Sequence, residues 1–182
     1  SGVPAEEITV VQSGIAVAEV ARTARSDPRP ALGLAGGTPL VITTGALVGH
    51  KDHATLVRAA QLAARSRPDL HWAIVGEGDR RGALEALIRE LAVEGWVHLL
   101  GEVPDAVRLV AAADLFVMSS AMEGLGTSVL DALALGIPVV GTAAGGIPEL
   151  LQGGAGRLVP PRDPAALAEA VRSVLENPEA RA

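Results

Sequence analysis

The 182-residue sequence contains no cysteine, no tyrosine and very few other aromatic residues. The absence of cysteine excludes disulfide frameworks, thiolate metal sites and thiol nucleophiles. It also favours a reducing compartment, so we expect a cytoplasmic location. Only Trp72, Trp96 and Phe116 could stack on bases, and the formal net charge of -6 opposes a phosphodiester backbone. We therefore expect no nucleic-acid partner.

Long hydrophobic runs are also missing. The longest uncharged run, Ala132 to Pro148, is interrupted by Pro138 and four glycines and is too short to span a bilayer. We predict no transmembrane segment. The 49% of hydrophobic residues against 20% charged ones is typical of a globular domain with a substantial core.

The beginning of the chain differs in pattern from the rest. It starts at Ser1 without an initiator methionine, carries an apolar run at Ile8 to Val11, and continues into a polar segment broken by Pro28 and Pro30. We expect residues 1–38 to be the end of a preceding lobe and a linker, and residues 39–182 to form the folded domain. The chain is thus expected to be a fragment of a longer protein.

From residue 39 onward, short apolar runs alternate with helical patterns. The runs lack an alternating polar face, which is typical of strands buried on both sides of a parallel sheet. Repeated strand and helix units with short loops predict a doubly wound parallel α/β fold, a Rossmann-like sheet of about six strands flanked by helices. The expected strands are Leu40 to Thr44, His71 to Val75, Val97 to Leu100, Asp114 to Met118, Pro138 to Val140 and Arg157 to Val159.

The turn after Met118 carries the clearest functional pattern. Gly124 and Gly126 allow close approach of a ligand, and a helix beginning near Thr127 would offer free N–H groups to a phosphate. Glu123 and Asp131 flank this turn and could accept hydrogen bonds from sugar and ribose hydroxyls. Two interpretations remain open here, because Ser128 to Asp131 also fits a capping box and Glu123 fits a solvated loop acid.

The turn Gly45 to His53 carries Lys51, which could reach a phosphate as a point charge. The alternative is a solvated lysine before a helix capped by Asp52, and the residues alone favour it. His50 and His53 lack a third ligand of matching chemistry, so we interpret them as surface imidazoles and predict no metal site.

Two further turns are rich in glycine. Gly76 to Gly82 resembles a dinucleotide fingerprint, but its third glycine falls one residue late. An NAD-linked oxidoreductase is therefore the weakest of the functional hypotheses. Gly145 and Gly146 precede a short helix, and a structural role explains them, although they would also permit close approach of a ligand.

With these motifs in place, the chain resembles the C-terminal, donor-binding lobe of a retaining GT-B glycosyltransferase of family 4, also called group 1. The resemblance covers about Leu40 to Leu175. It rests on several motifs in family order: Gly45 to Lys51, Val75 to Gly78, Leu100 to Pro104, Ser120 with Glu123 to Asp131, Gly136 to Val140, and Gly145 to Glu149.

The resemblance implies roles for individual residues. Lys51 would neutralise the donor diphosphate, with Gly45 beside it. Glu123, the first acid of the family's E-x7-E element, would hold the transferred sugar. Asp131, at the second acid, would meet the ribose, and the backbone near Val103 would meet the base. The backbone amides that would bind phosphate and sugar belong to Gly124, Leu125, Gly126 and Thr127. No cofactor or metal is expected, since the nucleotide-sugar is the substrate.

Two positions differ from the usual family pattern. Ala46 stands where an arginine is usual, which removes a charge-assisted contact of about 1.5 to 3 kcal/mol unless another residue replaces it. Asp131 stands where glutamate is usual, which sets the carboxylate back by about 1.5 Å. Both departures favour an alternative hypothesis, a non-catalytic module that binds a nucleotide or a partner protein.

The family's other lobe, which binds the acceptor, has no counterpart in this sequence. We therefore expect the N-terminal acceptor lobe to be supplied by the full-length protein, and the isolated lobe to be inactive. Peripheral membrane association would also run through that missing lobe. The nucleotide-sugar donor is the partner expected for this chain itself.

Overall fold

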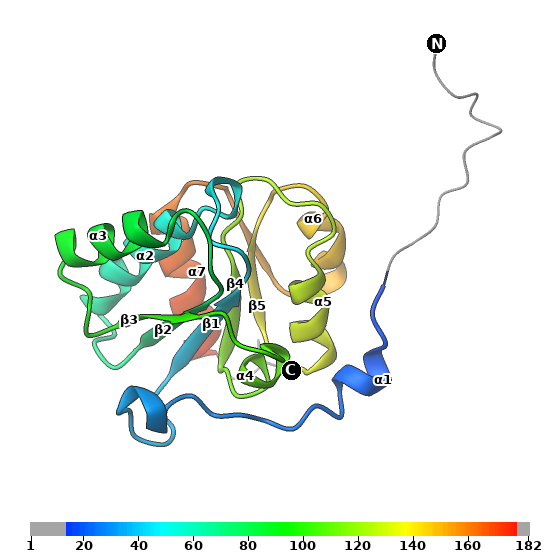
Figure 1. Ribbon diagram of the computed structural model, residues 1–182. Coiled ribbons are helices and arrows are strands. Elements are labelled where there is room, and N and C mark those ends of the chain that lie inside the picture. Colours follow the sequence, from blue (N-terminus) through cyan, green and yellow to red (C-terminus); the bar gives the residue numbers. More distant parts are fainter. Residues whose placement is uncertain (1–13, 178–182) are drawn as a thin grey trace, which may run out of the picture.

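A computed structural model of the protein describes residues 14–177. Its centre is one sheet of six parallel strands in the order β3-β2-β1-β4-β5-β6 (Figure 1). This confirms the predicted doubly wound α/β fold; the strand expected at Ile8 to Val11 lies outside the described residues. The strands are β1 (Leu40–Thr44), β2 (His71–Val75), β3 (Val97–Gly101), β4 (Leu115–Met118), β5 (Val139–Thr142) and β6 (Arg157–Val159).

Helices cover both faces of the sheet (Figure 1). One face carries α2 (His53–Ala64), α3 (Arg81–Glu90) and α7 (Pro164–Glu176). The other carries α4 (Val107–Val110), α5 (Thr127–Ala134) and α6 (Ile147–Leu150). Short elements complete the described chain: α1 (Val17–Val20) and the 3-10 turns η2 (Pro30–Leu32), η3 (Gly49–Lys51) and η4 (Gln152–Gly154). Within residues 14–177, no helix combines the length and the apolar character needed to cross a bilayer.

The core consists of two apolar layers, one on each side of the sheet. Successive residues of β1 point to opposite layers: Val41 packs with α2 and α7, whereas Leu40 and Ile42 pack with the α4 and α5 side. Both faces are therefore dry, which explains why the strand sequences show no polar alternation. The large side chains Trp72 and Phe116 are fully buried, one in each layer.

The helix starts follow the sequence signals where those signals are strong. The Asp52 carboxylate accepts hydrogen bonds from the N–H and the hydroxyl of Thr55, and the Asp163 carboxylate accepts one from the Ala166 N–H. Both aspartates are N-caps, and for Asp52 the sequence pattern indicated this role. The strand limits shift by a residue or two from the expectation, since the hydrogen-bonded register decides them.

Arg29 connects the segment before the sheet to the start of β1 and the residues just before β4. This side chain belongs to a residue that is only 6% exposed. Its guanidinium donates to Asp114 Oδ2 at 2.6 Å, to the Thr38 carbonyl at 2.6 Å and to the Ala112 carbonyl at 2.9 Å. Asp114 Oδ2 also accepts from the N–H of Leu40, the first residue of β1. A buried guanidinium that donates from all three of its nitrogens thus helps to fix where β1 and β4 begin.

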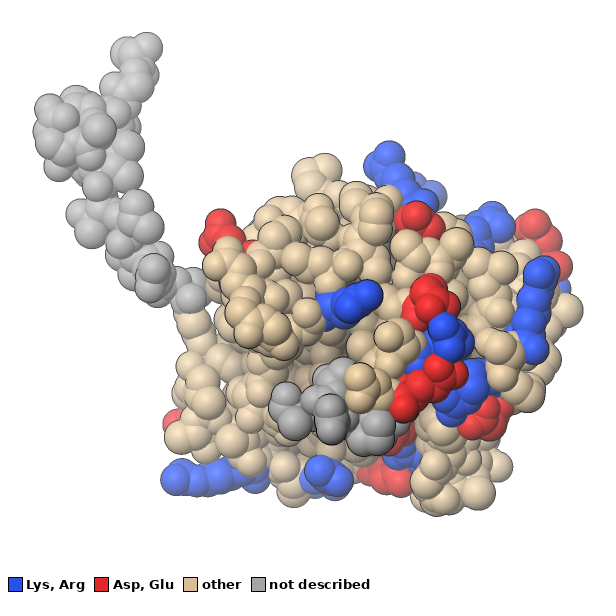
Figure 2. All heavy atoms as spheres, turned by 180° about the vertical axis from the view of Figure 1, so that it is seen from behind, with Lys and Arg blue, Asp and Glu red and all other residues tan. Residues whose placement is uncertain are grey.

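The molecular surface mixes charges of both signs. On the face seen in Figure 2, acidic and basic side chains lie next to one another and form no extended field of one sign. Ion pairs account for part of this pattern, as on α7, where Arg172 contacts Glu169 and Glu176.

Candidate functional site

Residues predicted to bind a ligand come together where the strand order reverses. β1 and β4 are neighbours in the sheet, but the helices that follow them lie on opposite faces. In such sheets, the crevice beyond the carboxyl ends of these two strands is where ligands bind. Lys51 follows β1 and Glu123 follows β4, so the fold brings both to this crevice from positions 72 residues apart in the sequence.

Glu123 and Lys51 form an ion pair beyond the carboxyl ends of β1 and β4. Lys51 Nζ lies 2.6 Å from Glu123 Oε2, and the two side chains are 19% and 11% exposed. Glu123 Oε2 also accepts from the Ser120 hydroxyl at 3.0 Å, and Oε1 accepts from the Gly124 N–H at 3.2 Å. Burial opposes ionisation of Glu123, but the bond and charge of Lys51, together with the bonds from Ser120 and Gly124, outweigh burial and hold the carboxyl pKa below its usual value.

Backbone contacts fix the loop that carries Glu123 against η3. The Ala121 N–H donates to the His50 carbonyl at 2.8 Å, and the Ser119 hydroxyl donates to the Lys51 carbonyl at 3.1 Å. From the other side, the Thr142 hydroxyl donates to the carbonyl of fully buried Ser120 at 2.5 Å. The acid and the lysine are therefore positioned by three segments of the chain rather than by their own side-chain contact alone.

The start of α5 lies next to Glu123, since a Cβ on Gly126 would stand 3.6 Å from Glu123 Cγ. Gly126 is the N-cap residue with φ 70°, and no side chain caps this helix. Within residues 14–177, the N–H groups of Gly126, Thr127 and Ser128 have no hydrogen-bond acceptor. A helix start with free N–H groups and a partial positive charge can hold an anion.

The capping-box interpretation of this helix is wrong. Ser128 lies inside α5 rather than at its N-cap, because the left-handed Gly126 starts the helix earlier than the box requires. Asp131 therefore lies more than one turn inside the helix. Its half-buried carboxylate has no hydrogen-bond partner among the described residues, and burial raises its pKa.

The backbone of Gly145 and Gly146 packs directly against the backbone of the loop that carries Glu123. A Cβ on Gly145 would lie 1.6 Å from the Glu123 carbonyl oxygen, and one on Gly146 would lie 2.6 Å from the Gly124 carbonyl oxygen. The Gly146 N–H donates to that same Gly124 carbonyl at 3.0 Å. The sequence favoured a structural role for this pair, and close backbone packing is that role.

The remaining predicted residues lie at different distances from the ion pair. Gly45 is adjacent to it, since a Cβ there would meet Lys51 Cε at 3.8 Å. Val103 follows the edge strand β3 and packs against the core. Asp131 and Val103 form no hydrogen bond or ion pair with Lys51 or Glu123. Among the described arginines, none forms such a bond with the pair either.

His53 contradicts the prediction of a surface imidazole. It is the first residue of α2 and only 4% exposed, because the helix packs on the sheet from its first turn. Burial, with a smaller effect from the Lys51 charge, lowers its pKa from 6.5 to about 4. His53 is therefore neutral at physiological pH, whereas the neighbouring His50 is exposed as expected.

This burial predicts an acid-dependent loss of stability. Unfolding returns the pKa of His53 from about 4 to 6.5, so the unfolded chain binds the extra proton. The stability due to the neutral imidazole is complete above pH 6.5 and falls by about 3 kcal/mol as the pH approaches 4. Urea unfolding of wild type and His53→Gln across this range should show a flatter pH profile in the variant. His50→Gln is the control and should keep the wild-type slope; equal slopes in all three proteins would refute the prediction.

Sequence reasoning assigned no role to Ser120 and Thr142. Ser120 donates to the Glu123 carboxylate and is itself held by Thr142 from β5. The available signal was a small hydroxyl residue at the carboxyl end of each of two neighbouring parallel strands, since those strand ends meet at the same edge of the sheet.

Comparison with known proteins identifies the family. The sequence model of the family described as glycosyl transferases group 1 matches residues 25–182. The chain belongs to this family. The match covers both the Lys51 turn and the Glu123 loop, so the ion pair lies within the region shared with other group 1 glycosyltransferases.

Two curated relatives act on a phosphatidylinositol monomannoside according to their names. A GDP-mannose-dependent monoacylated alpha-(1-6)-phosphatidylinositol monomannoside mannosyltransferase of Corynebacterium glutamicum is 32% identical over 167 residues, 87% of this chain and 43% of the relative. The corresponding GDP-mannose-dependent alpha-(1-6) enzyme of Mycolicibacterium smegmatis is 34% identical over 165 residues, 85% of this chain and 43% of its own length. The chain thus spans less than half the length of these relatives.

Solved structures share the fold. Anabaena HepE in complex with UDP-glucose is 28% identical, with a TM-score of 0.84 over 99% of this chain and 51% of that one. WaaG, a glycosyltransferase involved in lipopolysaccharide biosynthesis, is 25% identical, with a TM-score of 0.82 over 98% of this chain and 50% of that one. The architecture is therefore that of a Rossmann-like lobe of a GT-B glycosyltransferase.

Proposed function

We propose that this chain is the donor-binding lobe of a retaining glycosyltransferase that transfers a hexose from a nucleoside diphosphate to an acceptor. The observation that carries the proposal is the 2.6 Å pair of Lys51 and Glu123 next to the open start of α5. A cation and free N–H groups suit a diphosphate, and an adjacent carboxylate suits sugar hydroxyls.

Each residue has a task in this proposal. Lys51 and the amides of Gly126 and Thr127 would bind the diphosphate, and Glu123 would exchange its bond with Lys51 for bonds to the sugar. During transfer, negative charge grows on the departing diphosphate. A fixed ammonium and a helix start stabilise that charge where it develops, so the transition state gains more than the bound donor does. We propose that the reaction needs no metal ion, since Lys51 supplies the cation.

The remaining roles also rest on the family resemblance. Asp131, unpartnered and half-buried in α5, would meet the ribose, and the backbone near Val103 would meet the base. The acceptor would bind a second lobe in the full-length protein, so we expect the 182-residue chain to bind the donor without transferring sugar. The absence of cysteine supports a cytoplasmic location.

The test uses the fact that Lys51 is the sole lysine of the sequence. Uridine, guanosine and adenosine diphosphates are titrated into the ¹⁵N-labelled chain; two bases are represented among the relatives, UDP with HepE and GDP-mannose with the mannosyltransferases. At least one nucleotide should shift the amides of Gly126 and Thr127. It should also slow acylation of the Lys51 amine, measured by peptide mass spectrometry.

Two outcomes decide the proposal. Protection of Lys51 together with shifts at the start of α5 supports a diphosphate site. If all three nucleotides leave both readouts unchanged at about millimolar concentration, a range in which even a small ligand with a suited site binds, the proposal is refuted.

A further inference from the structure

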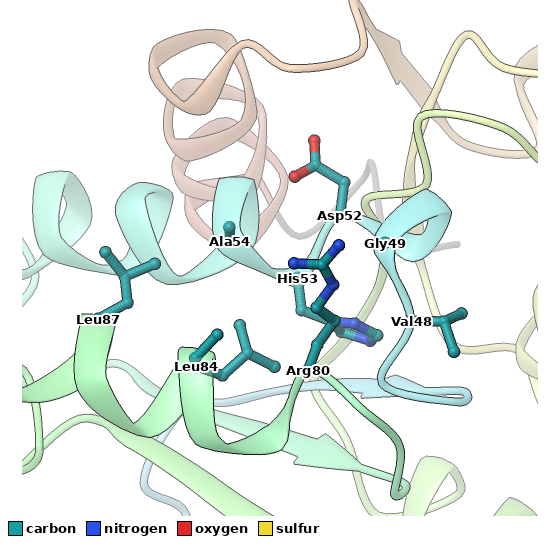
Figure 3. Close-up of a pocket in the computed structure, with 9 residues that line it drawn as sticks. Val48, Gly49, Asp52, His53, Ala54, Arg80, Leu84 and Leu87 are labelled. Carbon is teal, nitrogen blue, oxygen red and sulfur yellow. The ribbon is translucent and has the colours of Figure 1, made fainter.

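A cavity separate from the proposed donor site lies between the starts of α2 and α3 (Figure 3). We call it the α2–α3 pocket. It encloses about 270 Å³. Its walls are apolar at Val48, Leu84 and Leu87. Polar side chains line it at the starts of α2 and α3, where His53 and Arg80 lie. Glu123, Gly124 and Gly126 do not line it, so it is a different site from the crevice of the ion pair.

His53 supplies a buried polar group to this pocket. The residue lines the cavity and is 4% exposed, and its ring nitrogens form no hydrogen bond within residues 14–177. Within residues 14–177, no fully buried side-chain nitrogen or oxygen lacks a hydrogen-bond partner, so the unbonded ring nitrogens of His53 keep some accessible surface where the residue lines the cavity. The neutral imidazole offers one donor and one acceptor, so a polar ligand atom in the cavity would gain a bond at little desolvation cost to the protein.

Arg80 supplies a free cation at the mouth. Its guanidinium lies 3.5 Å from where a Cβ on Gly49 would stand, and among the described residues it has no hydrogen-bonding or ionic partner. Figure 3 shows it extending from the start of α3 toward the loop that joins η3 to α2. The nearby Asp52 carboxylate is bonded to Thr55 instead. A planar guanidinium of this kind binds a carboxylate or phosphate through two parallel hydrogen bonds.

We propose that the α2–α3 pocket binds a small organic anion, with a carboxylate or phosphate on Arg80 and a compact apolar body between the leucines. At about 30 Å³ for each water-sized group, the cavity holds about nine such groups, the size of one substituted ring. The His53 imidazole hydrogen-bonds the anionic group or its neighbour. This inference does not depend on the proposed donor site.

The experiment is an amide titration of the ¹⁵N-labelled chain with benzoate and with phenyl phosphate, which separates the two possible head groups. Benzyl alcohol tests the apolar body without charge, and inorganic phosphate tests the charge without an apolar body. We expect at least one aromatic anion to bind saturably at about millimolar concentration and to shift Gly49, Ala54 and Leu87. The two controls should bind at least about tenfold more weakly.

Variants of α3 sharpen the test. Arg80→Ala should weaken the aromatic anion about tenfold or more, because a charge-assisted pair is lost. Ala83→Phe should fill the pocket mouth and abolish binding. Arg89→Ala is the matched control, since Arg89 lies near the other end of α3, is exposed and does not line the pocket. It removes the same charge and should leave the affinity unchanged.

Three results would overturn the inference. One is the absence of saturable shifts for both aromatic anions at about ten times the expected dissociation constant. Another is equal weakening by Arg80→Ala and Arg89→Ala, which would indicate general charge attraction. The third is loss of aromatic-anion binding in Lys51→Ala, which would place the anion in the donor crevice. Loss of nucleotide binding in Lys51→Ala with intact benzoate binding would support two separate sites.

Discussion

Lys51→Ala is expected to weaken binding of the preferred nucleoside diphosphate by about 10- to 150-fold. The substitution removes a charge-assisted contact of about 1.5 to 3 kcal/mol from the diphosphate. Among the described residues, no arginine is bonded to Glu123 and could take over the role of Lys51. Position 46, where the family usually has arginine, carries alanine. Isothermal titration calorimetry at two salt concentrations measures the effect, and the salt dependence should fall along with the affinity.

The control for this variant is Arg58→Ala. Arg58 is exposed on α2, a few residues beyond Lys51, and its removal makes the same change in net charge. Its affinity should stay within about twofold of wild type, because a distant surface charge is screened by salt. If Lys51→Ala binds as tightly as Arg58→Ala does, Lys51 is a structural partner of Glu123 and not a ligand of the diphosphate.

Gly145→Ala is expected to lower the free energy of unfolding by about 2 to 5 kcal/mol and to abolish nucleotide binding. The new Cβ would stand 1.6 Å from the Glu123 carbonyl oxygen, so the loop that carries the acid must move. Overpacking of this kind costs about 1 to 3 kcal/mol, and a φ of 55° adds about 1 to 2 kcal/mol for a residue with a side chain.

Gly153→Ala separates these two contributions. Gly153 has a similar φ of 66°, but a Cβ there would meet no atom within 4 Å. Urea unfolding should therefore show a loss of only about 1 to 2 kcal/mol, with nucleotide binding retained. Equal destabilisation by the two variants, or normal binding by Gly145→Ala, would show that the loop of Glu123 does not rest on this glycine.

The general fold could be predicted from local sequence because each signal is local. Buried strands are recognisable in the sequence as short apolar runs. Asp52 and Asp163 each cap a helix by accepting a hydrogen bond from an N–H group three residues later in the chain. The family motifs also pointed to Lys51 and Glu123. Their residue types agree with the predicted roles, which the titration and the variants above will test.

The parts that sequence could not give depend on contacts between distant segments. The direct bond of Lys51 to Glu123 requires the pairing of β1 with β4, and the packing of Gly145 under Glu123 requires β5 beside β4. His53 follows three polar residues and looked exposed, yet the packing of α2 buries it. The capping-box interpretation of Ser128 to Asp131 was wrong because the N-cap residue of α5 is Gly126, which has no side chain to cap the helix.

The ion pair has a consequence for how fast a donor is captured. When the crevice is empty, Lys51 and Glu123 neutralise each other at 2.6 Å, and the chain as a whole carries a formal charge of -6. An approaching diphosphate therefore meets no attractive field at long range, and the association rate gains nothing from electrostatic steering. Attraction begins only after contact, when the Lys51 ammonium exchanges Glu123 for the diphosphate. Donors would therefore differ in affinity through their dissociation rates rather than through their association rates.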